Sequence, residues 1–126
     1  MNPLANKYRN KKVELDGILF DSKKEADVYQ DLKDQKTKGY ISDFQRQVRY
    51  ELVPAAYEEK EVRDKKDRLV RKKVCVEKAV DYVADFVVTF PDGEVSVIDP
   101  KGKKTKDYII KRKLMRHVHG IAIKEI

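Results

Sequence analysis

Residues 85–102 read DFVVTFPDGEVSVIDPKG, and they contain the clearest structural signal in the chain. Two runs rich in β-branched and aromatic residues flank the sequence PDG, a pattern typical of a β-hairpin. Pro91 favours the first central position of a type I turn, and Gly93 can adopt the left-handed conformation that closes a three-residue loop. The sequence therefore predicts an antiparallel hairpin in which Phe90 pairs with Glu94.

This register brings two carboxylates together at the far end of the hairpin. Counting back along both strands pairs Asp85 with Asp99, and side-chain alternation places Lys101 on the same face. Directly opposed residues lie about 4.5–5.5 Å apart at Cβ, so two carboxylates in this position repel each other. A loop one residue longer or shorter would put the two aspartates on opposite faces.

Folding alone gives little reason to place Asp85 opposite Asp99. A divalent cation bound between them would neutralise the repulsion of the two carboxylates. Mg²⁺ accepts carboxylate oxygens from one or two residues and keeps several waters for a substrate. Lys101 could then hold a water or offset charge on a phosphoryl oxygen. The alternative is that both aspartates are exposed strand ends, with Asp99 paired to Lys101. The register, taken together with Glu25, favours the metal site.

Glu25 belongs to a helix predicted over residues 22–38. Ser22 is a good N-cap, and Glu25 follows it at the spacing of a capping box. Glu25 also lies at the end of the apolar stripe formed by Val28 and Leu32, at the same helical spacing, which places its carboxylate near the sheet. A capping role and a role in the metal site, directly or through water, both stay open.

The rest of the chain supplies further strands and a second helix. We expect a hairpin over residues 13–20, strands over 41–53, 74–90 and 94–101, a helix over 105–119 and a last strand over 121–126. This order predicts an α/β or α+β domain with a mixed sheet. Residues 1–12 are predicted to be a basic flexible arm and 13–126 a single domain. The charge run at 57–73 is predicted to be a solvated hairpin or loop, or else a basic finger that contacts nucleic acid.

Composition narrows the class of protein. The chain has 126 residues, a net charge of +7 and a pI of about 9.4, which favours polyanionic partners, nucleic acid before an anionic membrane. Cys75 is the only cysteine, so no disulfide can form within one chain, which fits a reducing compartment. The sequence predicts neither a signal peptide nor a transmembrane helix. We expect a cytoplasmic protein with no membrane partner.

The order of these residues resembles the PD-(D/E)XK nuclease superfamily. The motif stands as Glu25, then YVADF with Asp85, then VIDPKG with Asp99 and Lys101. Most of the chain also resembles small phage and prophage proteins of that superfamily. That likeness lies in the segments FDSKKEADVYQDL, DYVADFVV, VIDPKG and TKDYIIKRKLM, spread over residues 20–115.

The resemblance implies a restriction-endonuclease-like fold, in which helices flank a mixed central sheet. It implies hydrolysis of DNA phosphodiester bonds with Mg²⁺ or Mn²⁺, on duplex or branched DNA, in phage or prophage DNA processing or recombination. Glu25, Asp85, Asp99 and Lys101 would be catalytic, with the three carboxylates as metal ligands. Holliday-junction resolvases share this plan and act as homodimers. A phage-encoded enzyme would work in the bacterial host cytoplasm.

The variable position of this motif, between Asp99 and Lys101, is occupied by Pro100, and proline is unusual inside a strand. Proline cannot donate a ladder hydrogen bond, so we expect an edge strand or a bulge there, which could turn Lys101 away. The basic residues that follow the motif are candidate phosphate contacts, although each could equally lie on a solvated helix face. They are Lys103, Lys104, Lys106, Lys111 and Lys113.

Two other classes of function remain open on the sequence. A non-catalytic, basic nucleic-acid-binding protein with a nuclease-like fold would bind DNA in EDTA and would not cleave it. A structural or assembly protein that only keeps the fold would show no salt-sensitive DNA binding.

Overall fold

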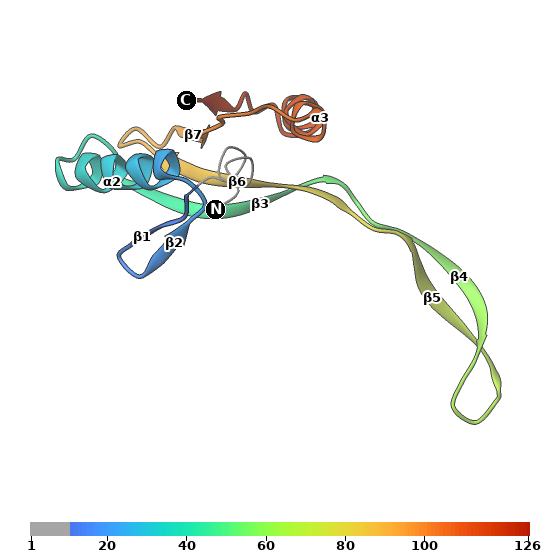
Figure 1. The fold of residues 1–126 in the computed structure, drawn as a ribbon. Helices are drawn as coiled ribbons and strands as arrows, with labels where there is room; N and C mark the ends of the chain where they lie inside the picture. Colours follow the sequence, from blue (N-terminus) through green and yellow to red (C-terminus); the bar gives the residue numbers. More distant parts are fainter. Residues whose placement is uncertain (1–10) are drawn as a thin grey trace.

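The computed structural model describes residues 11–126 and shows a mixed α+β fold (Figure 1). The predicted class, a mixed central sheet flanked by helices, is confirmed. The predicted flexible arm over residues 1–12 lies almost entirely outside the described residues. Within residues 11–126, no helix is long and apolar enough to cross a membrane.

The central sheet has four strands in the order β3-β6-β7-β8. Its members are β3 (Asp43–Val53), β6 (Val80–Thr89), β7 (Val95–Asp99) and β8 (Lys124–Glu125). The first three run antiparallel, and β8 joins β7 in parallel. Both helices pack on this sheet, one against each face.

The first face of the sheet carries α2 (Lys23–Thr37) and the small hairpin β1 (Val13–Leu15) and β2 (Ile18–Phe20). Ser22 caps α2 by accepting a hydrogen bond from the backbone N–H of Glu25 at 3.2 Å. The apolar residues buried on this face are Phe20, Ala26, Leu32, Ile41, Phe86, Val88 and Ile98. The predicted first hairpin and first helix are therefore confirmed.

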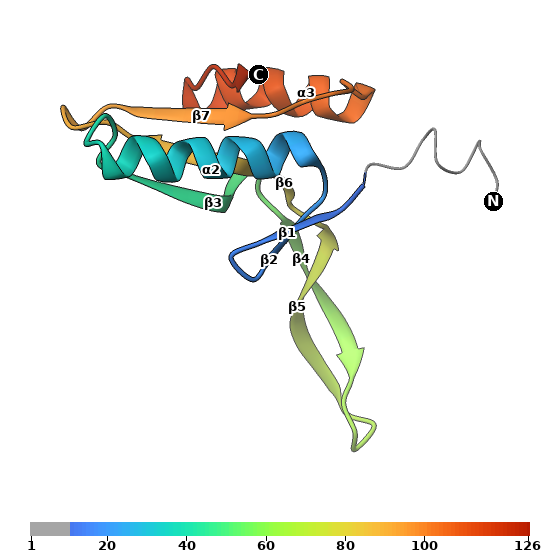
Figure 2. The same cartoon turned by 60° about the vertical axis from the view of Figure 1, so that its left-hand side comes forward.

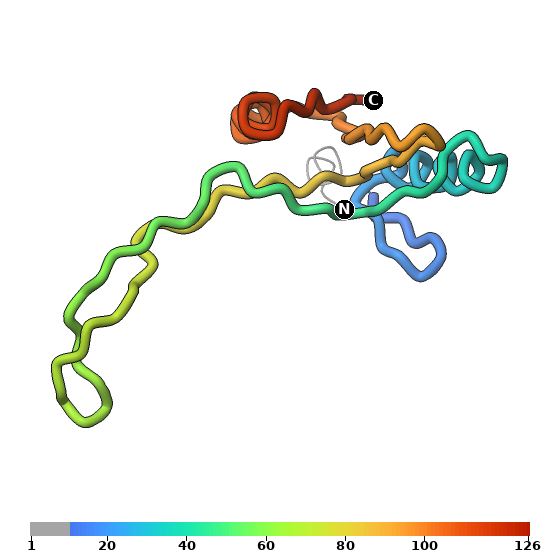
Figure 3. Tube along the Cα trace, turned by 180° about the vertical axis from the view of Figure 1, so that it is seen from behind, coloured from blue at the N-terminus to red at the C-terminus, as the bar shows by residue number. Residues whose placement is uncertain are grey.

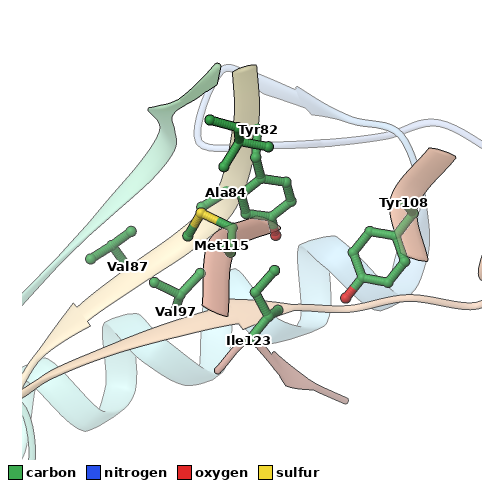
Figure 4. Packing of buried hydrophobic residues seen from close by; sticks show 8 residues of the cluster. Tyr82, Ala84, Val87, Val97, Tyr108, Met115 and Ile123 are labelled. Carbon is green, nitrogen blue, oxygen red and sulfur yellow. The ribbon is translucent and has the colours of Figure 1, made fainter. Parts of the chain in front are cut away.

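The second face carries α3 (Lys106–Leu114) and the π-helical turn η1 (Met115–His119). Figure 4 shows the side chain of Met115 surrounded by residues of β6 and β7. The core here contains Leu52, Tyr82, Ala84, Val87, Val97, Tyr108, Met115 and Ile123. The predicted helix over 105–119 is thus two segments, since the chain widens into a π-helix where Met115 enters the core.

The predicted register of the β6–β7 hairpin is confirmed. The backbone N–H of Phe90 donates to the carbonyl of Glu94 at 2.8 Å, and Gly93 closes the loop with φ of +90°. Thr89 pairs with Val95, and the ladder continues residue by residue to Phe86 and Ile98. The next step of this count brings Asp85 level with Asp99.

Three strand boundaries differ from the sequence prediction. The expected strand 74–90 is divided at residues 78–79, where the hairpin neck separates it into β5 (Leu69–Glu77) and β6. The last strand shrinks to Lys124–Glu125. The strand expected to reach residue 101 ends at Asp99, because Pro100 has no N–H to continue the ladder. β7 is also an interior strand and not an edge strand.

The charge run at residues 57–73 lies in a second antiparallel ribbon, formed by β4 (Ala56–Arg63) and β5. This ribbon continues the β3–β6 pair beyond Pro54 and projects away from both helices (Figures 1–3). Register shifts between Glu51 and Val53 and between Ala56 and Tyr57 mark the neck where the two ribbons meet.

Candidate functional site

The four residues of the motif gather where β6, β7 and the start of α2 meet. A shallow cavity of about 360 Å³ opens here. Its lining consists of Asp21, Ser22, Glu25, Asp85, Pro100, Lys101, Gly102 and Lys103. Asp99 is 1% exposed and lies at the end of β7.

Asp99 has one oxygen fixed and one oxygen without a hydrogen bond. The hydroxyl of Tyr82 donates to Oδ2 at 2.7 Å within the core. Oδ1 accepts no hydrogen bond from residues 11–126, and Nζ of Lys101 stands 3.6 Å from it. A buried carboxylate oxygen without a donor is costly. Oδ1 is therefore ready to accept a ligand.

Asp85 lies beside Asp99 and is also a partly buried carboxylate close to another negative charge. Burial and the neighbouring carboxylates of Asp99 and Glu25 raise the pKa of Asp85 to about 7, against the opposing effect of Lys101. The side-chain amide of Gln47 donates to Oδ1 of Asp85 at 3.3 Å. In the protein alone, a proton therefore relieves the repulsion between the two aspartates.

Glu25 forms the other wall of the cavity. It is 7% exposed, and burial raises its pKa, with further upward contributions from Asp21 and Asp99. Nη2 of Arg46 is 3.9 Å from Oε1 and opposes this rise, while the guanidinium stacks 4.6 Å from the ring centroid of Phe20. Ser22 caps the helix through its own hydroxyl. The Glu25 carboxylate therefore points into a charged, half-enclosed site.

The side chain of Lys101 points back toward Asp99, although Pro100 ends the strand. Its backbone N–H donates to the carbonyl of Asp99 at 3.0 Å, a tight turn that returns the side chain toward β7. Its ammonium lies 4.7 Å from the ring centroid of Tyr108, within the range of a cation–π contact. Pro100 therefore does not turn Lys101 away from Asp99, which answers the question that the sequence left open.

A model of the family described as Protein of unknown function (DUF1064) matches residues 5–123. The chain belongs to this family. No curated protein and no solved structure matches the sequence.

In this DUF1064 chain, the carboxylates suit one hard divalent cation held by two residues. Among residues 11–126, no three His, Cys, Asp or Glu side chains are grouped closely enough to hold one ion. The pair of Asp85 and Asp99 remains, and Mg²⁺ is commonly bound by one or two carboxylates and several waters. Glu25 lines the same cavity as Asp85 but forms no three-carboxylate cluster with the pair.

The five predicted phosphate contacts of the DUF1064 chain divide into separate groups. Lys103 lines the carboxylate cavity, and Lys111 lines a neighbouring cavity of about 280 Å³ together with Lys101 and Tyr108. Lys104 forms an ion pair with Glu125 at 3.1 Å.

The other two of these lysines lie on α3, at its two ends. Lys106 is exposed at the first residue of the helix. Lys113 lines a third cavity, of about 370 Å³, with Arg112 and Arg116. Lys103 and Lys111 are therefore the two that border the motif.

Three side chains of the site escaped the sequence reasoning: Tyr82, Arg46 and Tyr108. Regular alternation places Tyr82 and Asp99 on opposite faces. In the structure, Tyr82 and Ala84 lie in the same core cluster as Val87. The alternation of side chains along β6 is therefore broken between Ala84 and Val87. Gln47, level with Asp85 in the neighbouring strand, has φ of +53°, and this local irregularity lets Tyr82 reach Asp99.

Proposed function

We propose that this chain is a divalent-metal-dependent nuclease of the PD-(D/E)XK superfamily that hydrolyses phosphodiester bonds of DNA. The observation that carries the proposal is the pair of opposed aspartates with Lys101 beside them, because Oδ1 of buried Asp99 has no hydrogen-bond donor in the part of the chain that the structure describes. The order of Glu25, Asp85, Asp99 and Lys101 supports it, as does the mixed sheet with a helix on each face.

Each residue has a distinct part in the proposed reaction. Asp85 and Asp99 would hold the cation, and the hydroxyl of Tyr82 keeps Asp99 in one orientation. A bound cation would supply charge neutralisation and a more acidic water. Lys101 presents its ammonium at the mouth of the cavity, where it can stabilise charge on a phosphoryl oxygen. Glu25 can accept a hydrogen bond from a water and so orient it.

The experiment that tests the proposal is a cleavage assay on linear, nicked, flapped and four-way-junction DNA with Mg²⁺, Mn²⁺ or EDTA. We expect cleavage of at least one substrate in Mg²⁺ or Mn²⁺ and none in EDTA. Binding that persists in EDTA without cleavage in either metal would favour a non-catalytic nucleic-acid-binding protein instead. The resemblance also implies a homodimer, which sedimentation of the same sample measures.

Tyr82→Phe tests how Asp99 is positioned. Removal of the hydroxyl leaves the second oxygen of a buried carboxylate without a donor, so we expect Mn²⁺ affinity to fall about 10- to 100-fold, as is typical when a partner of a metal ligand is lost. Direct titration of Mn²⁺ measures this effect without any substrate. Tyr40→Phe is the matched control, since Tyr40 is exposed. Equal Mn²⁺ affinity of the two variants would exclude the positioning role.

The raised pKa of Asp85 predicts how stability depends on pH and on Mg²⁺. Its pKa rises from 3.8 to about 7 on folding, so its stabilising contribution is complete below about pH 4 and is lost as pH rises to about 7. Because Asp85 is partly exposed, we expect the free energy of unfolding to fall by only about 1–2 kcal/mol over this range.

Millimolar Mg²⁺ should therefore stabilise the protein more at about pH 8 than at about pH 5, because the cation competes with the proton. Urea unfolding at both pH values, with Mg²⁺ or EDTA, measures the difference. Asp85→Asn should abolish it, and Asp81→Asn is the matched control on the same strand. Equal stabilisation by Mg²⁺ at both pH values would contradict the shared site.

A further inference from the structure

The β4–β5 hairpin is the feature of the fold that the carboxylate site leaves unexplained. Across residues 56–77, all of which the structure describes, no side chain is buried. The ribbon points away from both helices in every view (Figures 1–3). A two-stranded hairpin alone in water is marginally stable. Such a long unsupported ribbon is therefore expected to have a partner.

Charge is concentrated in the outer part of this hairpin. Residues 60–73 contain eight basic and three acidic residues, so these 14 positions carry +5 of the chain's +7. The remaining 112 residues together carry only +2. The outer hairpin is therefore strongly positive for its length, as is the segment 101–114, whose 14 residues carry +6.

Two of the three acidic residues are used to build the turn. Asp64 accepts hydrogen bonds from the backbone N–H groups of Lys66 at 2.9 Å and Arg68 at 2.8 Å, and from Nε of Arg68 at 2.9 Å. Asp67 pairs with Arg63 at 3.6 Å. These contacts fix the turn and leave the lysine side chains at its tip for another partner.

The strands themselves contain one pairing that folding does not explain. Glu61 lies opposite Arg71, a complementary pair, whereas Lys60 lies directly opposite Lys72. Like charges directly opposed across two strands are destabilising. An anionic partner bound to both lysines would relieve the repulsion between them.

We propose that residues 60–73 form a second nucleic-acid-binding site, which holds the phosphates of duplex DNA at a distance from the carboxylate site. A two-stranded ribbon fits the major groove of a duplex, and lysines along it can contact the phosphates on either side. A second copy of the chain is a poorer occupant, because its hairpin carries the same +5 and its net charge is +7.

This inference deepens the proposed function, on which it rests, by assigning a long duplex as the substrate. The chain runs 18 residues from Asp85 back to Asp67, a path of at most about 60 Å at the rise of a β-strand. At about 3.4 Å per base pair, the duplex must therefore extend up to about 18 base pairs beyond the cleaved phosphate to reach the tip. Shorter duplexes would occupy the carboxylate site alone.

The test compares two variants that lose the same charge. The hairpin variant carries Lys60→Gln, Lys65→Gln, Lys66→Gln and Lys72→Gln. The control carries Lys33→Gln, Lys36→Gln, Lys38→Gln and Lys124→Gln on α2, its C-cap and β8. Binding to duplexes of about 8 and about 30 base pairs is measured in EDTA over a range of salt concentrations.

We expect the hairpin variant to bind the long duplex about 10- to 100-fold more weakly than the control, with a salt slope smaller by about 2–4. Affinity for the short duplex should match that of the control. The corresponding Lys→Arg variant should keep wild-type affinity, which separates loss of charge from loss of the ribbon. Equal binding of the long duplex by hairpin variant and control would overturn the inference.

The same samples separate this inference from the proposed function. Cleavage by wild type with no effect of the hairpin variant on long-duplex binding would leave the nuclease proposal and refute the second site. Loss of binding in the hairpin variant without any cleavage by wild type would do the reverse. A dimer that sediments as a monomer once the hairpin lysines are replaced would identify a second copy as the partner and also refute the inference.

Discussion

Asp99→Asn is expected to lower the rate of Mg²⁺-dependent DNA cleavage by about 10³-fold or more. Loss of a cation ligand removes several kcal/mol of charge stabilisation, and each 1.36 kcal/mol is about a factor of ten in rate. Asp99 is 1% exposed, and its Oδ1 accepts no hydrogen bond. Single-turnover cleavage with Mg²⁺ in excess measures this rate.

Stability distinguishes this catalytic role from a structural one. In EDTA we expect Asp99→Asn to be as stable as wild type or more stable, because the substitution removes the repulsion with Asp85 while an amide oxygen can still accept from Tyr82. Asp92→Asn, in the exposed turn of the same hairpin, is the matched control and should cleave normally. A less stable Asp99→Asn protein that retained wild-type cleavage would show that Asp99 serves only the fold.

Lys101→Met is expected to reduce single-turnover cleavage by about 10²–10³-fold while leaving Mn²⁺ affinity within a few-fold of wild type. Removal of one donor that faces developing charge typically has an effect of this size. Methionine keeps an unbranched, apolar side chain that can pack on Tyr108, but it removes the ammonium that stands 3.6 Å from Oδ1 of Asp99. Cleavage rate and Mn²⁺ titration together separate charge stabilisation from cation binding.

Lys101→Arg refines the same prediction. If Lys101 acts as a fixed positive charge, arginine should restore about a tenth or more of the wild-type rate, because it also stacks on aromatic rings. If Lys101 transfers a proton, arginine should be as inactive as methionine, since it does not lose its proton. Lys124→Met on the exposed strand β8 is the control. Wild-type cleavage by Lys101→Met would remove Lys101 from the mechanism.

Much of the candidate site could be predicted from the sequence because its geometry is local. The three-residue loop that Pro91 and Gly93 favour fixes the register of the hairpin, and the register places Asp85 level with Asp99. Ser22 likewise starts α2 at a defined residue and puts Glu25 in its first turn. Turn and cap preferences act over three or four residues, so sequence patterns report them directly.

The prediction failed where one element depends on another. The division of the long strand at residues 78–79 depends on the neck opposite Pro54, in the partner strand. The π-helical turn at Met115 depends on the core that this side chain enters. Periodicity within a segment contains no information about such partners.

The hairpin register, the start of α2 and the location of the charge run follow from local sequence patterns. Only packing between distant segments explains that Tyr82 holds Asp99, that Arg46 faces Glu25 and that Lys101 lies on Tyr108. The tertiary structure also decided that the charge run projects from the body as an ordered ribbon. The physical reason is that turns and caps satisfy hydrogen bonds between near neighbours, whereas these contacts join segments that only packing brings together.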